Sequence, residues 1–343
     1  MAYDDFCPFY ERAFKNIRGG FMEKVLVSLL LGASILVIHY LSIGTVVFDE
    51  KGWILSIIIT VASLSLFFAT HTFRMLLPQL GQRLKPNERD KLIVSINNYL
   101  SDRKFLLGGM TFGFLNSLMG VLFGLPDIYD SILDKAVILG SYFIAGFICG
   151  VALSGIVGVT KCINSFSKNL EPIFDYTSQD KCGGTRFIGW ALLIFSTVTL
   201  VVGVLITVYI SITEWKYKSE VYVSILYASW ILLPYIASIF VLLVPAISIN
   251  KSLNRYKLDK EKKLSESIKL LFNELENKDI SPERKSELYL DYQFQTNMRK
   301  ELHEMRTWPF SIGTNSTYFL SVASSFYTTY ESVNSWFPTP PPT

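Results

Sequence analysis

The side chains best placed to do chemistry in this sequence are polar groups that lie inside long apolar runs. His39 and Asn116 each stand within such a run. A polar group in hydrocarbon is costly unless it is hydrogen-bonded or faces water. Each of the two residues is therefore a candidate for a functional site or for a structural bond to a neighbouring helix, and both interpretations stay open.

Hydroxyl side chains recur along a later apolar run at helical spacing. Ser196, Thr199 and Thr207 are members of this stripe. Such a stripe can line a narrow hydrated path, and it can equally satisfy neighbouring helices. Pro234 and Pro245 each remove a backbone donor from the following run and are expected to kink its helix. Together these residues predict a candidate polar path or gate.

Catalytic chemistry has few residues to use. The chain holds three histidines and four cysteines, with no CxxC pair and no Cys/His cluster. No nucleophile elbow, zinc-protease motif, phosphate-binding loop or dinucleotide fingerprint occurs. The sequence therefore predicts no cofactor, no metal site and no enzymatic activity.

The elements that must position these residues are six apolar runs without Asp, Glu, Lys or Arg. Half of the 343 residues are hydrophobic, and the excess is concentrated in these runs. A helix of about 20 residues crosses a hydrocarbon core roughly 30 Å thick. The sequence thus predicts an all-α polytopic membrane protein with six transmembrane helices at Val25 to Phe48, Trp53 to Phe73, Leu106 to Leu125, Ala136 to Thr160, Phe187 to Thr213 and Val221 to Asn250.

Small residues recur every four positions in the third and fourth runs. They are Gly109 and Gly113 in the third run, and Gly146, Gly150, Ser154 and Gly158 in the fourth. Small residues at this spacing let two helix backbones approach closely. We expect these two spans to cross tightly, within one protomer or between two.

Basic residues predict the orientation. Segments 1–24, 74–105, 161–186 and 251–306 hold 28 of the 32 Lys and Arg residues. Basic residues near span ends are retained in the cytoplasm. Both termini are therefore predicted to be cytoplasmic, in a protein of the plasma membrane.

Four regions follow from this organisation. They are an interfacial amphipathic helix at 1–24, the six-helix domain at 25–250, a cytoplasmic helical hairpin at 251–306, and an aromatic, Ser/Thr-rich tail at 307–343 that ends in a disordered Pro-rich segment. Ser281 and Pro282 supply an N-cap and a first-turn proline for the second hairpin helix. Trp308, Pro309 and Phe310 are expected to stop that helix and wedge the tail against the hairpin or the membrane.

Two functions of different classes fit this pattern. The first is an ion or small-solute channel or transporter, which requires a continuous polar path. The second is a non-conducting membrane scaffold or sensor that recruits partners through its cytoplasmic hairpin, which requires a dry bundle. The expected partners are the lipid bilayer, further copies of the chain and a cytoplasmic protein. Nucleic acid is not expected, because acidic and basic residues are interspersed in the hairpin.

Overall fold

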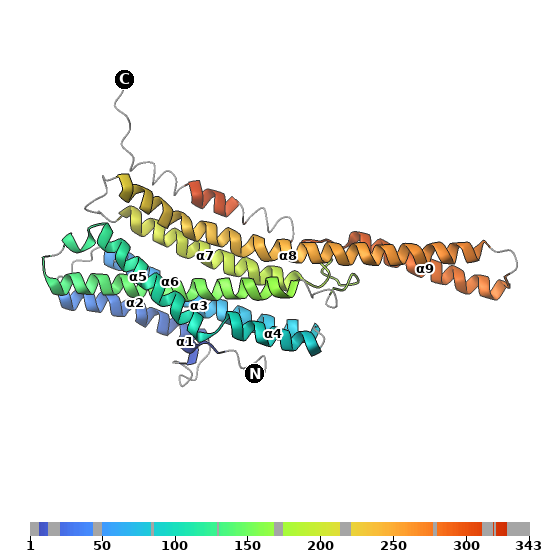
Figure 1. The fold of residues 1–343 in the computed structure, drawn as a ribbon, viewed down its shortest axis with the longest axis horizontal. Coiled ribbons are helices and arrows are strands. Elements are labelled where there is room, and N and C mark those ends of the chain that lie inside the picture. The colour runs from blue at the N-terminus through green and yellow to red at the C-terminus, as the bar shows by residue number, and fades with distance from the viewer. Residues whose placement is uncertain are drawn as a thin grey trace, which may run out of the picture.

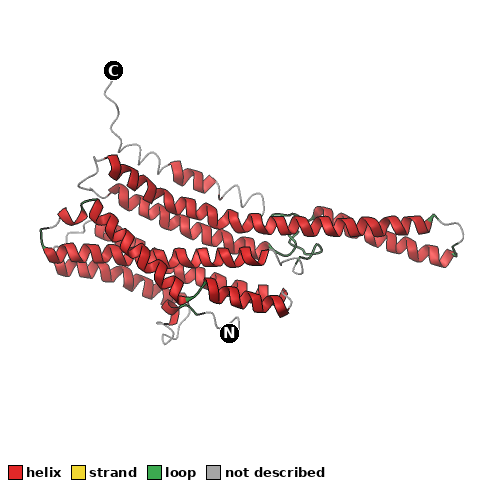
Figure 2. Cartoon of the chain, viewed as in Figure 1, coloured by secondary structure: helices red, strands yellow, loops and turns green. Residues whose placement is uncertain are grey.

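The protein is a bundle of long helices from which one helix pair projects (Figure 1). The computed structural model describes residues 7–12, 21–43, 50–83, 86–128, 130–167, 174–212, 221–276, 280–310, 318 and 320–327. Within these residues the regular structure is helical and contains no strand, as Figure 2 shows. The helices are α1 (Phe9–Arg12), α2 (Phe21–Ile43), α3 (Glu50–Arg83), α4 (Pro86–Tyr99), α5 (Asp102–Leu122), η2 (Leu125–Ile128), α6 (Ile132–Ser167), α7 (Arg186–Ile212), α8 (Val221–Leu275) and α9 (Pro282–Glu304).

Five helical stretches among the described residues are long and apolar enough to cross a membrane. They are Gly52–Gly81, Arg89–Leu122, Ile132–Ser165, Arg186–Ser211 and Ala228–Leu275. The length and composition of these stretches identify an integral membrane protein. Each overlaps one of the predicted runs. The first predicted run falls on α2, and its last residues, 44–48, lie outside the described residues.

The sequence also predicts a short amphipathic helix before the third run, and α4 has those bounds, Pro86–Tyr99. Leu100 and Ser101 separate it from α5. The predicted N-terminal amphipathic helix is described only at Phe9–Arg12, because residues 13–20 lie outside the described residues.

Helix α8 is the longest element, with 55 residues. At a rise of 1.5 Å per residue it is about 80 Å long, far more than a membrane crossing needs. It continues past Asn250 without a break, so the change of composition at Lys251 does not end the helix. Its apolar first part belongs to the bundle, and its charged second part projects from it (Figure 1).

Helix α9 runs back beside the projecting part of α8 (Figure 1). The Oγ of Ser281 accepts a hydrogen bond from the N–H of Arg284 at 3.4 Å, so Ser281 is the N-cap and Pro282 opens the helix. Phe272 and Tyr292 meet between the two helices, with ring centroids 6.4 Å apart. We call residues 251–304 of this pair the arm.

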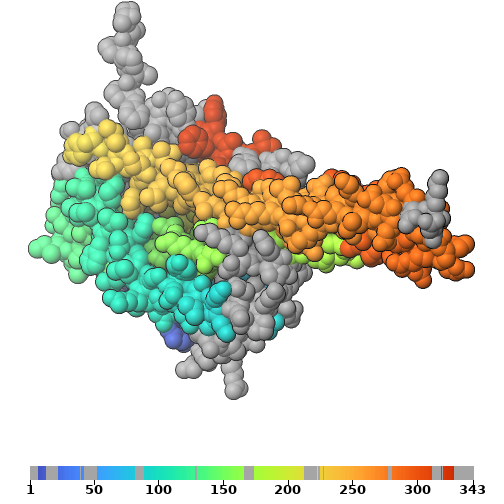
Figure 3. Space-filling model, turned by 45° about the vertical axis from the view of Figure 1, so that its right-hand side comes forward, coloured from blue at the N-terminus to red at the C-terminus, as the bar shows by residue number. Residues whose placement is uncertain are grey.

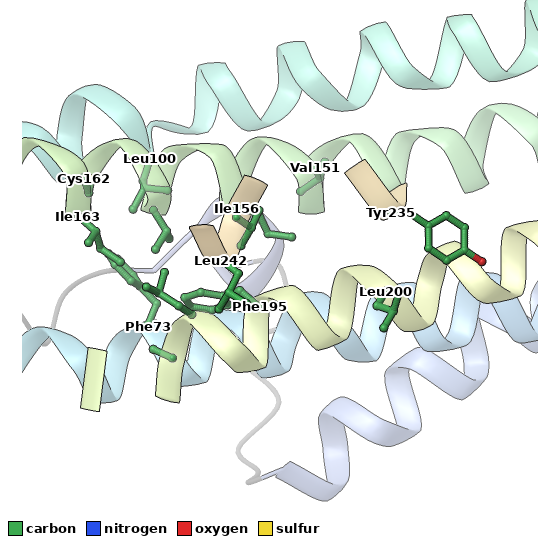
Figure 4. Packing of buried hydrophobic residues seen from close by; sticks show 14 of the residues in the cluster. Phe73, Leu100, Val151, Ile156, Cys162, Ile163, Phe195, Leu200, Tyr235 and Leu242 are labelled. Atoms are coloured by element: carbon green, nitrogen blue, oxygen red, sulfur yellow. The ribbon is translucent and has the colours of Figure 1, made fainter. Parts of the chain in front are cut away.

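The core of the bundle is apolar and lies between α3, α6, α7 and α8. Figure 4 shows Ile156, Phe195 and Leu242 gathered from three of these helices. Ile231, Leu242 and Ile249 of α8 are 0–1% exposed. One face of α8 is therefore fully packed along the bundle.

After α9 the chain returns along the bundle. We call residues 306–310, 318 and 320–327 the strap; it lies on the surface over α8 (Figure 3). The backbone carbonyl of Pro309 lies against Gly189 of α7, and Phe310 is 5% exposed. The Pro309 and Phe310 pair is thus wedged against α7, whereas Trp308 is exposed.

Candidate functional site

The hydroxyl stripe of α7 lies against α8, in what we call the α7–α8 seam. Ser196 and Ser238 are both fully buried there. The Oγ of Ser196 donates to the carbonyl of Ser238 at 2.7 Å, and the Oγ of Ser238 donates to the carbonyl of Ser196 at 2.8 Å. This reciprocal pair joins the two helices across their interface.

Tyr318 of the strap completes this polar cluster. Its hydroxyl lies 2.5 Å from the Oγ of Ser238 and also hydrogen-bonds the Oγ of Ser196. The side chain is buried, with 7% exposure. A residue from the end of the chain therefore inserts between α7 and α8 and shares the hydroxyl groups that the sequence assigned to a candidate polar path.

The seam contains a second polar contact, nearer the end of the bundle that lies away from the arm. The Oγ1 of Thr207 donates to the carbonyl of Gly203 at 3.0 Å and lies 3.1 Å from the hydroxyl of Tyr235. A Cβ on Gly203 would stand 2.8 Å from the Cβ of Pro234, so Pro234 packs directly on α7 at this glycine. Both polar side chains are buried and satisfied.

A cavity of about 140 Å³ opens beside the seam. Residues of α3, α5, α6, α7 and α8 line it, and nearly all of their side chains are apolar. An apolar cavity of this size can accept a benzene-sized ligand. The chemistry of the lining suits an apolar guest and offers little to a hydrated ion.

Three of the predicted site residues meet at this cavity: Asn116, Thr199 and Pro234. The Nδ2 of Asn116 donates to the carbonyl of Tyr142 at 2.7 Å, and the Oγ1 of Thr199 donates to the carbonyl of Phe195 at 2.8 Å. These donors serve helix backbones. They do not project unpaired into the cavity.

Two residues of the predicted polar path belong neither to the cavity nor to the seam. Pro245 lies farther along α8, at neither the cavity nor the seam contacts. His39 belongs to α2, and its side chain lies outside the described residues.

The predicted small residues lie where α5 crosses α6. A Cβ on Gly146 would stand 2.6 Å from the carbonyl oxygen of Phe112, and one on Gly113 would stand 2.8 Å from the ring of Phe143. Gly150 and Gly109 make similarly close approaches, and Ser154 faces Gly108. Gly158 lies against Leu100 and Tyr99, at the end of α4.

A buried charge cluster ties α1 to the bundle at the end that faces the arm. The carboxylate of Glu11, 7% exposed, pairs with Arg74 of α3 and with Lys24 of α2, the latter at 3.1 Å. The hydroxyl of Tyr10 lies 2.7 Å from the Oγ1 of Thr70, and burial raises the pKa of Tyr10 to about 12. Tyr10 therefore stays protonated at neutral pH.

The turn before α7 is built around Asp180. Its carboxylate accepts hydrogen bonds from the backbone N–H groups of Cys182 at 2.8 Å, Gly184 at 2.9 Å and Arg186 at 3.2 Å. Burial acts to raise the pKa of Asp180, but these bonds outweigh it and hold the pKa below its ordinary value of 3.8. The same turn contains Gly183 at φ 63°, which places the chain in the left-handed region.

The arm carries polar contacts that fix its base. The Nζ of Lys257 donates to the carbonyls of His303 and Met305, both at 2.9 Å, at the end of α9. The Nδ2 of Asn250 donates to the carbonyl of Thr307 at 3.1 Å. These bonds connect the arm, the strap and α8.

Groups of three or more His, Cys, Asp or Glu side chains that could hold a metal ion do not occur among the described residues. The cysteines are free thiols, and Cys162 and Cys182 are buried.

The comparisons with known proteins give no relative. No protein-family model, no curated protein and no solved structure matches this chain. The function is therefore argued from the geometry alone.

Sequence reasoning missed the two residues that most define the seam. Ser238 and Tyr318 are each within hydrogen-bonding distance of Ser196, although they lie 42 and 122 residues from it in sequence. Ser238 follows Pro234 by one helical turn, which could have suggested a shared face. No local signal marks Tyr318, because its partners are brought to it only by the fold.

Proposed function

We propose that this chain is a non-conducting membrane scaffold or sensor, which holds the arm at the cytoplasmic surface and presents it to a protein partner. The observation that carries the proposal is the construction of α8. One uninterrupted helix forms part of the bundle and the first half of the arm. The position of the arm is thereby coupled to the packing of the membrane-embedded helices.

The proposal takes α2 as a sixth span. Its 23 residues give about 35 Å of helix, enough for a hydrocarbon core of about 30 Å. Leu26, Leu29 and Leu30 are more than half exposed, as suits a surface in contact with lipid. The Oγ of Ser56 in α3 donates to the carbonyl of Gly32 at 2.8 Å, which fixes α2 against its neighbour.

With six spans, the segment before α2 and the arm lie on the same side of the membrane in this proposal. The Lys and Arg distribution in the segments between spans favours the cytoplasm for that side.

The contacts of the seam support a non-conducting bundle. The hydroxyl of Ser196 bonds α8, and those of Thr199 and Thr207 bond carbonyls of α7 itself. Tyr318 occupies the cluster around Ser196. The neighbouring cavity is apolar. A path for ions needs polar groups that replace the hydration shell.

The outward surface of the arm supports partner binding. Leu258 and Leu270 of α8, and Leu290 and Phe294 of α9, are all more than 60% exposed. Large apolar side chains on a water-facing helix pair cost free energy unless another surface covers them. Leu290 and Phe294 are one helical turn apart, so they lie on the same face of α9.

The direct experiment is a double substitution on this face. We expect Leu290→Glu together with Phe294→Glu to abolish recovery of a specific stoichiometric partner from native membranes. The matched control is Thr296→Glu, which adds a charge at an exposed position on a different face of α9 and should leave recovery unchanged. Recovery would be measured by quantitative mass spectrometry of the purified complex. Equal recovery of the same partner by the double variant and by the control would rule out this docking face.

The same variants test whether the surface that covers these side chains is a second copy of the chain. If the covering surface is a second copy of the chain, light scattering of the purified protein in detergent should show a multimer that the double variant converts to a monomer.

A channel or transporter is the second candidate, and one observation favours it. Asn116, Thr199 and Pro234, predicted from three separate spans, line one cavity. On this alternative the cavity holds a small apolar solute in transit. Thr199→Phe should then abolish uptake of that solute into vesicles, and partner binding by the arm should be unaffected. We assign no catalytic reaction to either candidate.

A further inference from the structure

A second hollow lies on the opposite side of α7, at the strap. It is a crevice of about 660 Å³. Its walls are α7, Phe68 of α3, and strap residues that include Phe310 and Tyr318. The strap is therefore one wall of the crevice, and the outer surface of α7 is the other.

The crevice changes character along its length. Arg186, the first residue of α7, lines one end, and Trp190 one turn later is 61% exposed. Leu193, Ile194 and Leu200 line the rest. The distance from Arg186 to Leu200 along the helix is about 21 Å, and half of the hydrocarbon core is about 15 Å. A cation, then an aromatic ring, then an apolar wall follow one another over the depth of a single leaflet.

Two guanidinium groups at this end are available to an anion. Arg186 lines the crevice, and Arg306 lies outside its lining, at the start of the strap. Neither side chain forms an ion pair with a described residue. The backbone N–H of Arg306 donates to the carbonyl of Lys181 at 2.6 Å, which holds the start of the strap against the turn that leads into Arg186. Neither nearby carboxylate pairs with these guanidinium groups: Asp180 accepts from three backbone N–H groups, among them that of Arg186, and Glu304 pairs with Lys181 at 2.8 Å.

We propose that this crevice is a binding site for one anionic phospholipid from the leaflet that faces the arm. Its phosphate lies at Arg186 and Arg306, its glycerol region at Trp190, and one acyl chain between α7 and the strap. Basic pockets at span ends bind anionic headgroups, and tryptophan favours the interface between headgroup and hydrocarbon. The site requires only that α7 crosses the membrane, so it is independent of whether the arm binds a partner.

The test is stepwise lipid binding to the full-length protein in detergent, followed by native mass spectrometry. The two probes are dioleoyl phosphatidylglycerol and dioleoyl phosphatidylcholine. We expect the first phosphatidylglycerol to bind at least about tenfold more tightly than phosphatidylcholine. Each of Arg186→Gln and Arg306→Gln should weaken it about fivefold, as expected for the loss of one basic contact.

Arg103→Gln is the matched control. Arg103 is exposed at the start of α5, outside the crevice, and its substitution removes the same charge near the same end of the bundle. We expect it to leave both affinities unchanged. Equal affinities for the two lipids in the unmodified protein would overturn the proposal. A loss of phosphatidylglycerol affinity in Arg103→Gln equal to that in Arg186→Gln would also overturn it.

A second variant tests the acyl chain. Thr197→Phe fills the crevice without a change of charge. This variant should weaken the binding of both lipids at this site. In the unmodified protein, water-soluble glycerol phosphate should not displace phosphatidylglycerol. Displacement by glycerol phosphate would show that the site binds a phosphate group alone, and would contradict the proposal.

Discussion

Two helix pairs in this bundle differ in what contributes most to their contact. In the α5–α6 pair the glycines let the backbones approach closely along the crossing, so most of the contact is van der Waals packing, and Asn116 and Ser117 add hydrogen bonds to carbonyls of α6. In the α7–α8 seam the helices are joined by hydroxyl hydrogen bonds, and a tyrosine from the strap is inserted into them. The contacts of the first pair come from α5 and α6 alone. The seam also includes Tyr318 of the strap, which follows α9 in the sequence. The seam is therefore the part of the bundle that the strap and the arm can influence.

The largest effect is expected where backbones are in contact. Gly146→Leu would place a side chain against the carbonyl of Phe112, and overpacking of this kind costs about 2–3 kcal/mol. Gly140→Leu is the control, because a Cβ at this exposed glycine of α6 meets nothing within 4 Å. We expect thermal unfolding in detergent to shift strongly for the first variant and little for the second. Equal shifts would mean that the α5–α6 pair does not depend on close backbone approach.

The seam should respond less to a single change. Ser238→Ala removes the bond from the Ser238 Oγ to the carbonyl of Ser196 and the contact with Tyr318, while the bond from Ser196 to the backbone carbonyl of residue 238 remains. The change should cost about 1–2 kcal/mol. The double variant Ser238→Ala, Tyr318→Phe should lose less stability than the two single variants lose together, because the two residues share one cluster. The control is Ser229→Ala, at an exposed serine whose Oγ bonds the carbonyl of Ile225 in its own helix. Additive costs in the double variant would contradict a shared cluster.

Some of this comparison could be predicted from the sequence. The spacing of Gly146 and Gly150 is a local pattern, so it predicts a close crossing, and Ser281 with Pro282 predicts the start of α9. The α7 hydroxyl stripe is equally local, but the pattern is the same whether its neighbour is water or a helix. Tyr318, which joins the cluster, is 122 residues from Ser196. The continuity of α8 was hidden because its composition changes at Lys251 while its helical backbone does not.

A smaller effect is expected at the base of the arm. Lys257→Met removes the donor to the carbonyls of His303 and Met305 at the end of α9 and should cost about 1 kcal/mol. Amide hydrogen exchange should then become faster at the end of α9 and in the strap. The control is Lys269→Met, which changes an exposed lysine of α8 farther from the end of α9. Faster exchange confined to α9 would show that the strap is held independently of the arm.

The smallest effect concerns pH. The pKa of Asp180 is lower in the folded protein than its ordinary value of 3.8, so its contribution to stability is complete above that value. The contribution is lost as the pH falls through the lower folded pKa, because protonation removes the charge that the three N–H groups stabilise. Unfolding midpoints of the protein should therefore decline below about pH 4 more steeply than those of Asp180→Asn. Parallel curves for the two proteins would show that the turn before α7 does not depend on this charge.

The measurement that tests the central claim most directly is ion flux through the purified protein in sealed liposomes. Potassium, sodium and chloride gradients would be imposed across a membrane loaded with a potential-sensitive dye. The scaffold account predicts no specific flux from the unmodified protein and none from Ser238→Ala. Specific flux from the unmodified protein that Thr199→Phe abolishes would contradict it and establish a pore beside the α7–α8 seam.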